Sequence, residues 1–189
     1  MARNVAAMVA AKAASAHSKA PQQQEGLRKL IVAVGAQNGR TIQAGLVGPD
    51  AQEMLPSGIS VATLGYTQEF GIGVPERAYT RITEAREVKK WMARIIQITS
   101  EEMHQVAASK ESPKKAEEKA AKVAWNKYLA LGSQMASDLR STITSGVAPA
   151  NAASTIKEKG SNTPLVDTGK MLHANAAEID FQGRKQVVK

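Results

Sequence analysis

The sequence predicts an α+β fold, in which a small, mostly antiparallel sheet packs against two long helices. Short segments rich in β-branched residues, bounded by glycine, proline and asparagine, occur near both ends of the chain, and two long amphipathic segments lie between them. A chain of 189 residues is long enough to bury one medium-sized core. We therefore expect a single domain over residues 25–189, preceded by an N-terminal helical arm over residues 1–24.

The first 20 residues are rich in alanine and contain no acidic residue. Lys12 interrupts their apolar run, which argues against a secretory signal peptide, and a single arginine is weak support for the alternative of a transit peptide. Val5, Met8 and Val9 have helical spacing. An isolated short helix has an unfavourable nucleation cost, so this arm is expected either to need a partner surface or to be mobile.

Two strands are predicted next, at Leu27–Val34 and Thr41–Val47, because both segments combine aliphatic and β-branched residues. Asn38-Gly39 between them is a strong hairpin signal, since both residues tolerate positive φ. The first segment also has helical spacing, so the end of a helix is an alternative there.

The middle of the chain begins with a loop over residues 49–58 and an apolar segment, Ile59–Phe70, that suits either a strand or a short helix. Proline fixes φ and disfavours helix immediately before it, so Pro75 directs the chain into an extended conformation. A short strand is therefore predicted at Arg77–Ile82.

Two long helices follow, each predicted from an apolar stripe that repeats every three to four residues. The stripe of the first helix consists of Val88, Trp91, Met92, Ile95, Ile98, Met103 and Val106. Pro113 suits the first turn of the second helix, which Ser145-Gly146 ends. The stripe of the second helix consists of Ala121, Trp125, Tyr128, Leu129, Gly132, Met135, Leu139 and Ile143. A glycine on this stripe lowers helix propensity, so Gly132 indicates that another backbone packs close to the helix there.

The C-terminal part begins with a long loop over residues 147–164 that contains a possible helical turn. Asp167 is expected to cap the backbone amides that follow it, and Gly169 is expected to adopt a backbone geometry that a larger residue resists. Ala177–Phe181 is predicted as a strand, and Gln186–Lys189 either pairs with it or frays.

The composition limits the functions open to this chain. The absence of cysteine excludes disulfides, thiolate zinc sites and a cysteine nucleophile. No apolar run approaches the ~20 residues that span a bilayer, so no membrane partner is expected. The net charge is +8. Basic and acidic residues are interspersed and aromatics make up only 4%, which favours a solvated basic surface over a nucleic-acid platform. Contact with nucleic acid or with an anionic protein remains the alternative.

The chemical motifs predict no enzyme. The Asp-Thr-Gly triplet at residues 167–169 resembles that of aspartic proteases, which need two carboxylates that share a proton. Only 20 residues follow Gly169, too few for the rest of such a protease, and Lys170 would bring a positive charge to the dyad. Glu101 and His104 form a single Glu-x-x-His, whereas di-iron bundles use this motif twice. We therefore predict no catalytic residue, no metal ligand and no cofactor.

Two ordered stretches carry a resemblance to a known family. The first runs from Thr67 to Arg81 (TQEFGIGVPERAYTR), and the second runs from Ala153 to Leu172 (ASTIKEKGSNTPLVDTGKML). In this order they resemble the tail-completion, or virion morphogenesis, proteins of tailed bacteriophages, although Ala78-Tyr79 stands where that family has Pro-Phe. The residues that carry the resemblance are Glu69, Phe70, Gly71, Pro75, Arg77, Tyr79, Pro164, Leu165, Asp167, Thr168 and Gly169.

The resemblance implies a structural virion protein at the head–tail junction or the tail end. Such proteins form a homo-oligomeric ring, commonly a hexamer, that caps the tail tube or joins it to the neck, after assembly in the host cytoplasm. The expected partners are copies of the chain itself, the connector or neck, and tail tube or sheath proteins, with transient contact between the ring lumen and genomic DNA. The alternative, which rests on charge alone, is a basic DNA-binding accessory protein.

Particular residues have expected roles in such a protein. Tyr79 is expected to anchor the strand at Arg77–Ile82 to the core while its hydroxyl reaches solvent. Glu69 and Arg77 are expected to pair, within one subunit or across to a neighbour. The loops at 49–58 and 147–164, together with the N-terminal arm, are the segments expected to contact other subunits or the neck.

Overall fold

The computed structural model describes residues 39–189, so the predicted arm (1–24), the predicted strand at Leu27–Val34 and Asn38 of the hairpin turn lie outside the described residues. The described part is an α+β fold, as predicted. Its elements, in chain order, are β1 (Arg40–Leu46), the 3-10 helix η1 (Pro49–Gln52), α3 (Val61–Phe70), α4 (Tyr79–Ala108), α5 (Pro113–Thr144), α6 (Ala153–Lys159), α7 (Lys170–His173), β2 (Asn175–Phe181) and β3 (Arg184–Val188).

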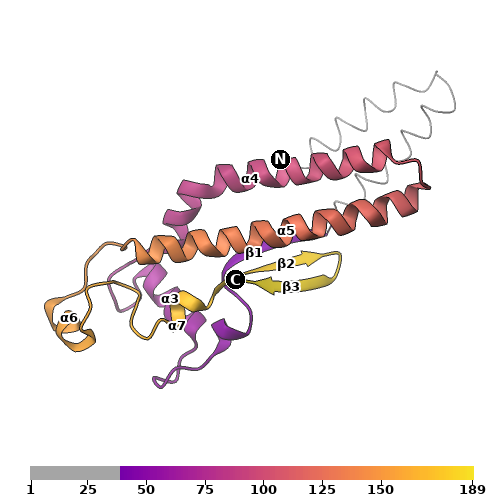
Figure 1. Cartoon of the computed structure of the whole chain (residues 1–189). Coiled ribbons are helices and arrows are strands. Elements are labelled where there is room, and N and C mark those ends of the chain that lie inside the picture. The colour runs from indigo at the N-terminus through magenta and orange to yellow at the C-terminus, as the bar shows by residue number, and fades with distance from the viewer. Residues whose placement is uncertain (1–38) are drawn as a thin grey trace.

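These elements form three layers, in which α5 lies between α4 and the sheet (Figure 1). Both predicted long helices are present. Pro113 stands in the first turn of α5, where its missing N–H costs nothing because that amide has no helical partner. The helices α3, α6 and α7 gather at the end of α5 that is opposite the turn from α4 (Figure 1).

The sheet has the order β1-β2-β3 and both pairs are antiparallel. The predicted strand at Thr41–Val47 is β1, and its partner β2 comes from the other end of the described chain, with Arg40 opposite Phe181. Of the two alternatives for the C-terminal segment, pairing and fraying, the structure shows pairing. The strand β3 pairs with β2, with Ala177 opposite Val188 at one end of the register. The central strand β2 thereby joins the first and last strands of the described chain.

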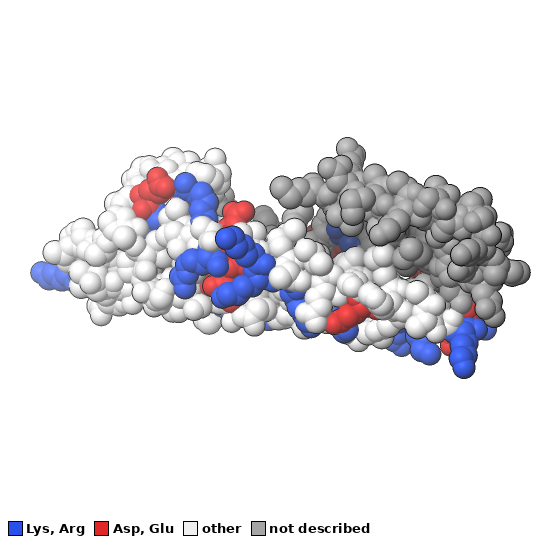
Figure 2. All heavy atoms as spheres, turned by 90° about the horizontal axis from the view of Figure 1, so that it is seen from above, with Lys and Arg blue, Asp and Glu red and all other residues white. Residues whose placement is uncertain are grey.

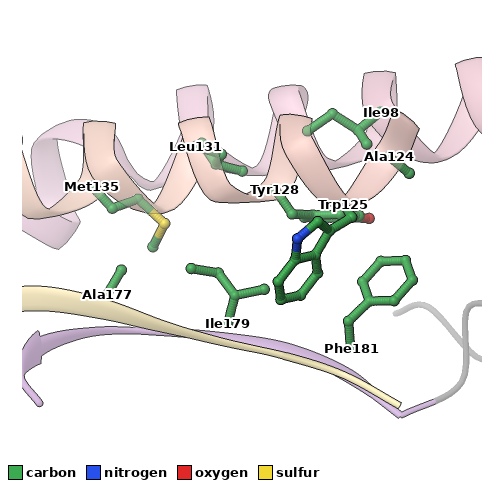
Figure 3. Packing of buried hydrophobic residues seen from close by; sticks show 9 residues of the cluster. All are labelled: Ile98, Ala124, Trp125, Tyr128, Leu131, Met135, Ala177, Ile179 and Phe181. Atoms are coloured by element: carbon green, nitrogen blue, oxygen red, sulfur yellow. The ribbon is translucent and has the colours of Figure 1, made fainter. Parts of the chain in front are cut away.

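The main core lies between α5 and the sheet (Figure 3). From Ala177 to Phe181, buried side chains of β2 alternate with more exposed ones, as a half-buried strand requires, whereas Asn175 and Ala176 are both buried. The Trp125 and Phe181 rings meet edge to face at 5.7 Å between centroids, a favourable aromatic geometry. The buried members of this core are Ile98, Ala124, Trp125, Tyr128, Leu131, Met135, Ala177, Ile179 and Phe181.

Gly132 brings α5 close to the sheet, as its place on the apolar stripe predicted. A Cβ atom at this position would lie 2.7 Å from Cδ1 of Ile179 and 3.2 Å from Cβ of Ala177. The first of these atoms ends a flexible side chain, but the second is held by the central strand. A side chain at Gly132 therefore has no room without a shift of the sheet.

We expect Gly132→Leu to lower the free energy of unfolding by about 1–3 kcal/mol, because overpacking displaces α5 from β2. Urea denaturation followed by circular dichroism measures this change. Ala130→Leu, at an exposed position of the same helix, is the matched control and should change stability little. Equal stabilities of the two variants would contradict the close approach at Gly132.

The predicted strand at Arg77–Ile82 is wrong. Residues 75–78 have no regular structure, and Tyr79 begins α4, which is therefore longer than its apolar stripe indicated. The reason is tertiary: the Glu69 carboxylate accepts hydrogen bonds from the backbone amides of Thr80 at 3.0 Å and Arg81 at 3.1 Å. These amides have no partner inside the helix, so the carboxylate stabilises a helix start here.

The segment Ile59–Phe70 forms the helix α3 rather than a strand. Ser60 caps this helix by accepting a hydrogen bond from the Thr63 amide at 3.1 Å, and Gly71 ends it with φ at +67°. The loop at 49–58 contains η1, and the loop at 147–164 contains α6, which fulfils the predicted helical turn.

Candidate functional site

The two stretches that carry the family resemblance meet at the end of the molecule where α5 finishes (Figure 1). Tyr79 from the first stretch and Met171 from the second belong to one buried apolar cluster, against which Leu165 packs. The other buried members are Val61, Leu139, Ile143, Val147 and Ala174. Segments far apart in the sequence thus share a second core, which we call the end core.

Glu69 organises the first stretch. In addition to the two amides of α4, its carboxylate accepts a hydrogen bond from Nε of Arg81 at 3.2 Å. Arg81 also donates to the Glu69 carbonyl at 2.6 Å and to the Glu76 carboxylate at 2.7 Å. The hydrogen bonds that Arg81 donates to Glu76 and Glu69 raise its pKa above its ordinary value. These contacts fix the turn between α3 and α4.

Arg77 ties this turn to the loop that follows α5. Its side chain is buried and donates from Nε to the Pro149 carbonyl at 3.0 Å and from Nη1 to the Gln68 side-chain oxygen at 3.1 Å. It reaches the Asn151 side-chain oxygen at 3.4 Å. The expected pair with Glu69 within one subunit is therefore wrong. The Arg77 guanidinium instead contacts carbonyl oxygens, because Arg81 already pairs with the Glu69 carboxylate.

Tyr79 is buried in the end core, so the expectation that its hydroxyl reaches solvent is wrong. Only 2% of the residue is exposed, and its hydroxyl donates to the Asn175 side-chain oxygen at 3.4 Å. Asn175 in turn donates from Nδ2 to the Met171 carbonyl at 2.8 Å. Burial raises the pKa of Tyr79 to about 12, since the charged phenolate loses its hydration there.

The second stretch combines buried anchors with an exposed turn. Pro164 is buried, Leu165 adopts a positive φ of 64°, and Gly169 has φ at +79°, which confirms its expected special geometry. The expected capping by Asp167 is wrong: no hydrogen bond joins its exposed carboxylate to the residues of 39–189. Instead, Thr168 Oγ1 lies 3.5 Å from the Lys170 amide.

A shallow groove of about 350 Å³ runs between the loop at 49–58 and the second stretch. An ion pair of 2.6 Å between Lys170 and Glu53 links the same two segments. The groove is lined by Leu55, Pro56, Ser57, Val61, Leu64, Leu165, Asp167, Thr168, Gly169, Lys170 and Met171. Its mostly apolar lining suits packing against another surface better than it suits acid–base chemistry.

The outer surface of α3 and of the turn that follows it carries large exposed apolar side chains, which we call the end patch: Tyr66, Phe70, Ile72 and Val74, exposed by 58%, 51%, 52% and 37%. The Tyr66 and Phe70 rings contact each other at 4.8 Å between centroids, and the Arg81 guanidinium lies 5.2 Å from the Phe70 ring centre. Sequence reasoning singled out only Phe70. The signal for the others was an i, i+4 aromatic pair followed by two aliphatic residues between glycines and proline.

The remaining motif residues shape the backbone around the end patch. Gly71 ends α3, and a Cβ atom there would lie 2.9 Å from Cβ of Glu76, so only glycine fits. Pro75 is exposed in the segment that leads into α4. The turn is therefore compact, and it presents Ile72 and Val74 outward.

Within residues 39–189, no three histidine or acidic side chains converge as metal ligands would. None of the described helices has the length and apolar character to cross a membrane. Comparisons of the chain with protein-family models, with curated proteins and with solved structures find no match.

Proposed function

We propose that this protein is a structural virion protein of a tailed bacteriophage, which forms a ring at the tail end or the head–tail junction and acts by assembly rather than by catalysis. The ordered pair of stretches at Thr67–Arg81 and Ala153–Leu172 supports this proposal. The single observation that carries it is the end patch, which lies on α3 and the turn into α4, and this turn rests on the end core that both stretches share.

The end patch has the chemistry of an association surface. Burial of apolar surface contributes roughly 25 cal/mol per Å², and large exposed apolar patches on a protein mark sites of interaction. Aromatic residues are the typical anchors of protein interfaces, and Tyr66 and Phe70 present two adjacent rings. Glu69 and Arg77 hold the backbone beneath them, so association has little ordering cost at this point.

The shape of the subunit suits a ring. The end patch lies at one end of a molecule built along α5, whose 32 residues span about 48 Å. When one surface meets a different surface on the next copy, the contacts are heterologous and close into a ring if the rotation allows. The resemblance makes a hexamer the expected copy number, with the connector or neck and the tail tube or sheath as neighbours in the virion.

We expect the full chain to form annular particles, visible as countable class averages in electron microscopy and as a concentration-dependent species in sedimentation velocity. Tyr66→Ser/Phe70→Ser should remain monomeric at concentrations where the wild type assembles, because it removes both aromatic anchors. Val187→Ser, at an exposed apolar position of β3, is the matched control and should assemble. Circular dichroism checks that all three fold.

Two outcomes would contradict this proposal: a wild type that stays monomeric at high concentration, or a double variant that assembles like the wild type. A monomer that retains DNA, with retention that falls steeply as salt rises, would instead support the basic DNA-binding alternative.

A further inference from the structure

The helix α4 has a second apolar face that nothing in the described chain covers. Ile82, Ala85, Lys89, Met92 and Ile96 follow one another at spacings of three, four, three and four residues, which places them along one face of the helix. All five are exposed, and Met92 and Ile96 are exposed by 51% and 64%. We call this face the α4 seam.

The α4 seam is distinct from the face that packs on α5. Trp91, Ile95 and Ile98 of α4 contact the main core. A helix that covers α5 needs only that one apolar face, with polar residues opposite. The alternating three–four spacing of a second apolar line is the pattern by which one helix packs against another.

Two basic residues and one acidic residue, Glu84 beside Ala85, lie in or next to the α4 seam, so its net charge is positive. Lys89 lies within it, and Arg86 lies one turn after Ile82; neither forms an ion pair with any residue of 39–189. The nearby acid Glu87 instead lines the groove between α4 and α5, together with Lys90 and Arg94. Figure 2, which looks down on the molecule from above, shows basic side chains gathered in the middle of the view, with acidic side chains among them.

These charges favour some binding partners of the α4 seam over others. A second copy of α4 laid antiparallel on the seam would place Lys89 opposite Lys89. The N-terminal arm carries Arg3, Lys12 and Lys19 and no acid within its first 20 residues, so it would also meet like charge. Like charges in contact oppose association, whereas carboxylates opposite the seam favour it.

We propose that the α4 seam binds an acidic amphipathic helix of another protein. Its apolar stripe packs on Ile82, Met92 and Ile96, and its carboxylates lie opposite Arg86 and Lys89. Helix-in-groove recognition of this kind takes its affinity from the apolar anchors and its selectivity from charge. The proposal goes beyond ring formation and does not depend on it, since the end patch and the α4 seam are different surfaces.

The test uses the full chain and two synthetic peptides of about three heptads, with leucine at positions a and d. One carries glutamate at positions e and g, and the other carries lysine there. Fluorescence anisotropy should show that the glutamate peptide binds at least about tenfold more tightly than the lysine peptide, with a preference that weakens as salt rises.

Variants assign the binding to the seam. Met92→Ser/Ile96→Ser should weaken binding of the glutamate peptide about tenfold or more, and Arg86→Glu/Lys89→Glu should shift preference toward the lysine peptide. Val187→Ser is the control and should bind as the wild type does. The proposal is overturned if neither peptide binds, if both bind equally, or if the serine variants bind unchanged.

Self-association is a separate outcome of the same variants. If Met92→Ser/Ile96→Ser dissociates an oligomer that Tyr66→Ser/Phe70→Ser leaves intact, a second copy occupies the α4 seam and the present proposal fails. Loss of assembly in Tyr66→Ser/Phe70→Ser alone leaves peptide binding untouched, so the two proposals fail independently.

Discussion

Glu102→Ala is expected to lower the free energy of unfolding by about 3–5 kcal/mol, because it removes the carboxylate that accepts two hydrogen bonds from the buried Arg40 guanidinium. Arg40 donates from Nη1 to Oε2 of Glu102 at 2.5 Å and from Nη2 to Oε1 at 2.9 Å. The two side chains are exposed by only 6% and 2%. The Arg40 guanidinium also lies 3.7 Å from the centre of the Phe181 ring, so the pair joins β1 and β2 to α4.

Urea denaturation of the wild type and of Glu102→Ala measures this loss. The neighbouring Glu101 provides a matched control, since it pairs with Lys127 at the surface. The hydrogen bond from Lys127 lowers the pKa of Glu101, but water screens such exposed pairs, so Glu101→Ala should have a far smaller effect. Equal losses of unfolding free energy in the two variants would show that the buried Arg40–Glu102 pair stabilises the fold no more than a surface pair does.

Tyr79→Ala is expected to cost about 3–5 kcal/mol of folding stability, the range for removal of a buried aromatic side chain. Tyr79 belongs to the end core, and its hydroxyl is hydrogen-bonded to Asn175. Its removal should also reduce assembly in sedimentation velocity, because the turn that carries the end patch rests on this core. Tyr66→Ala, at an exposed tyrosine, is the stability control and should leave unfolding nearly unchanged.

Tyr79→Phe separates the ring from the hydroxyl and should cost much less than Tyr79→Ala. It also tests the raised pKa. The pKa of an unfolded tyrosine is near 10, whereas burial raises the pKa of Tyr79 to about 12. The unfolded state therefore releases its proton first, and the contribution of Tyr79 to stability falls as the pH rises from 10 toward 12. Chemical denaturation across this range should show a steeper fall for wild type than for Tyr79→Phe.

The candidate site was only partly predictable. The resemblance led to Glu69, Arg77 and Tyr79, but the structure gives all three a role in holding the turn and the end core. Tyr66 and Ile72, which belong to the exposed end patch, were not predicted, because an exposed apolar residue and a core residue look alike in a sequence. Only the packing of α3 against the rest of the protein shows which of its faces stays exposed to solvent.

The long helices follow from the sequence itself, because an apolar stripe with helical period and a proline at a first turn are local properties of α4 and α5. The strands β1 and β2 follow from local composition in the same way, and Gly132 even indicated a close approach to α5, whereas the sequence left open whether β3 pairs or frays. Tertiary structure decided the rest. The strand expected at Arg77–Ile82 is absent, and a helix begins at Tyr79, because the carboxylate of Glu69 in another helix accepts hydrogen bonds from the first amides of α4. The pairing of β1 with β2 likewise joins opposite ends of the described chain. Contacts between residues far apart in sequence determine both outcomes, and no local pattern contains them.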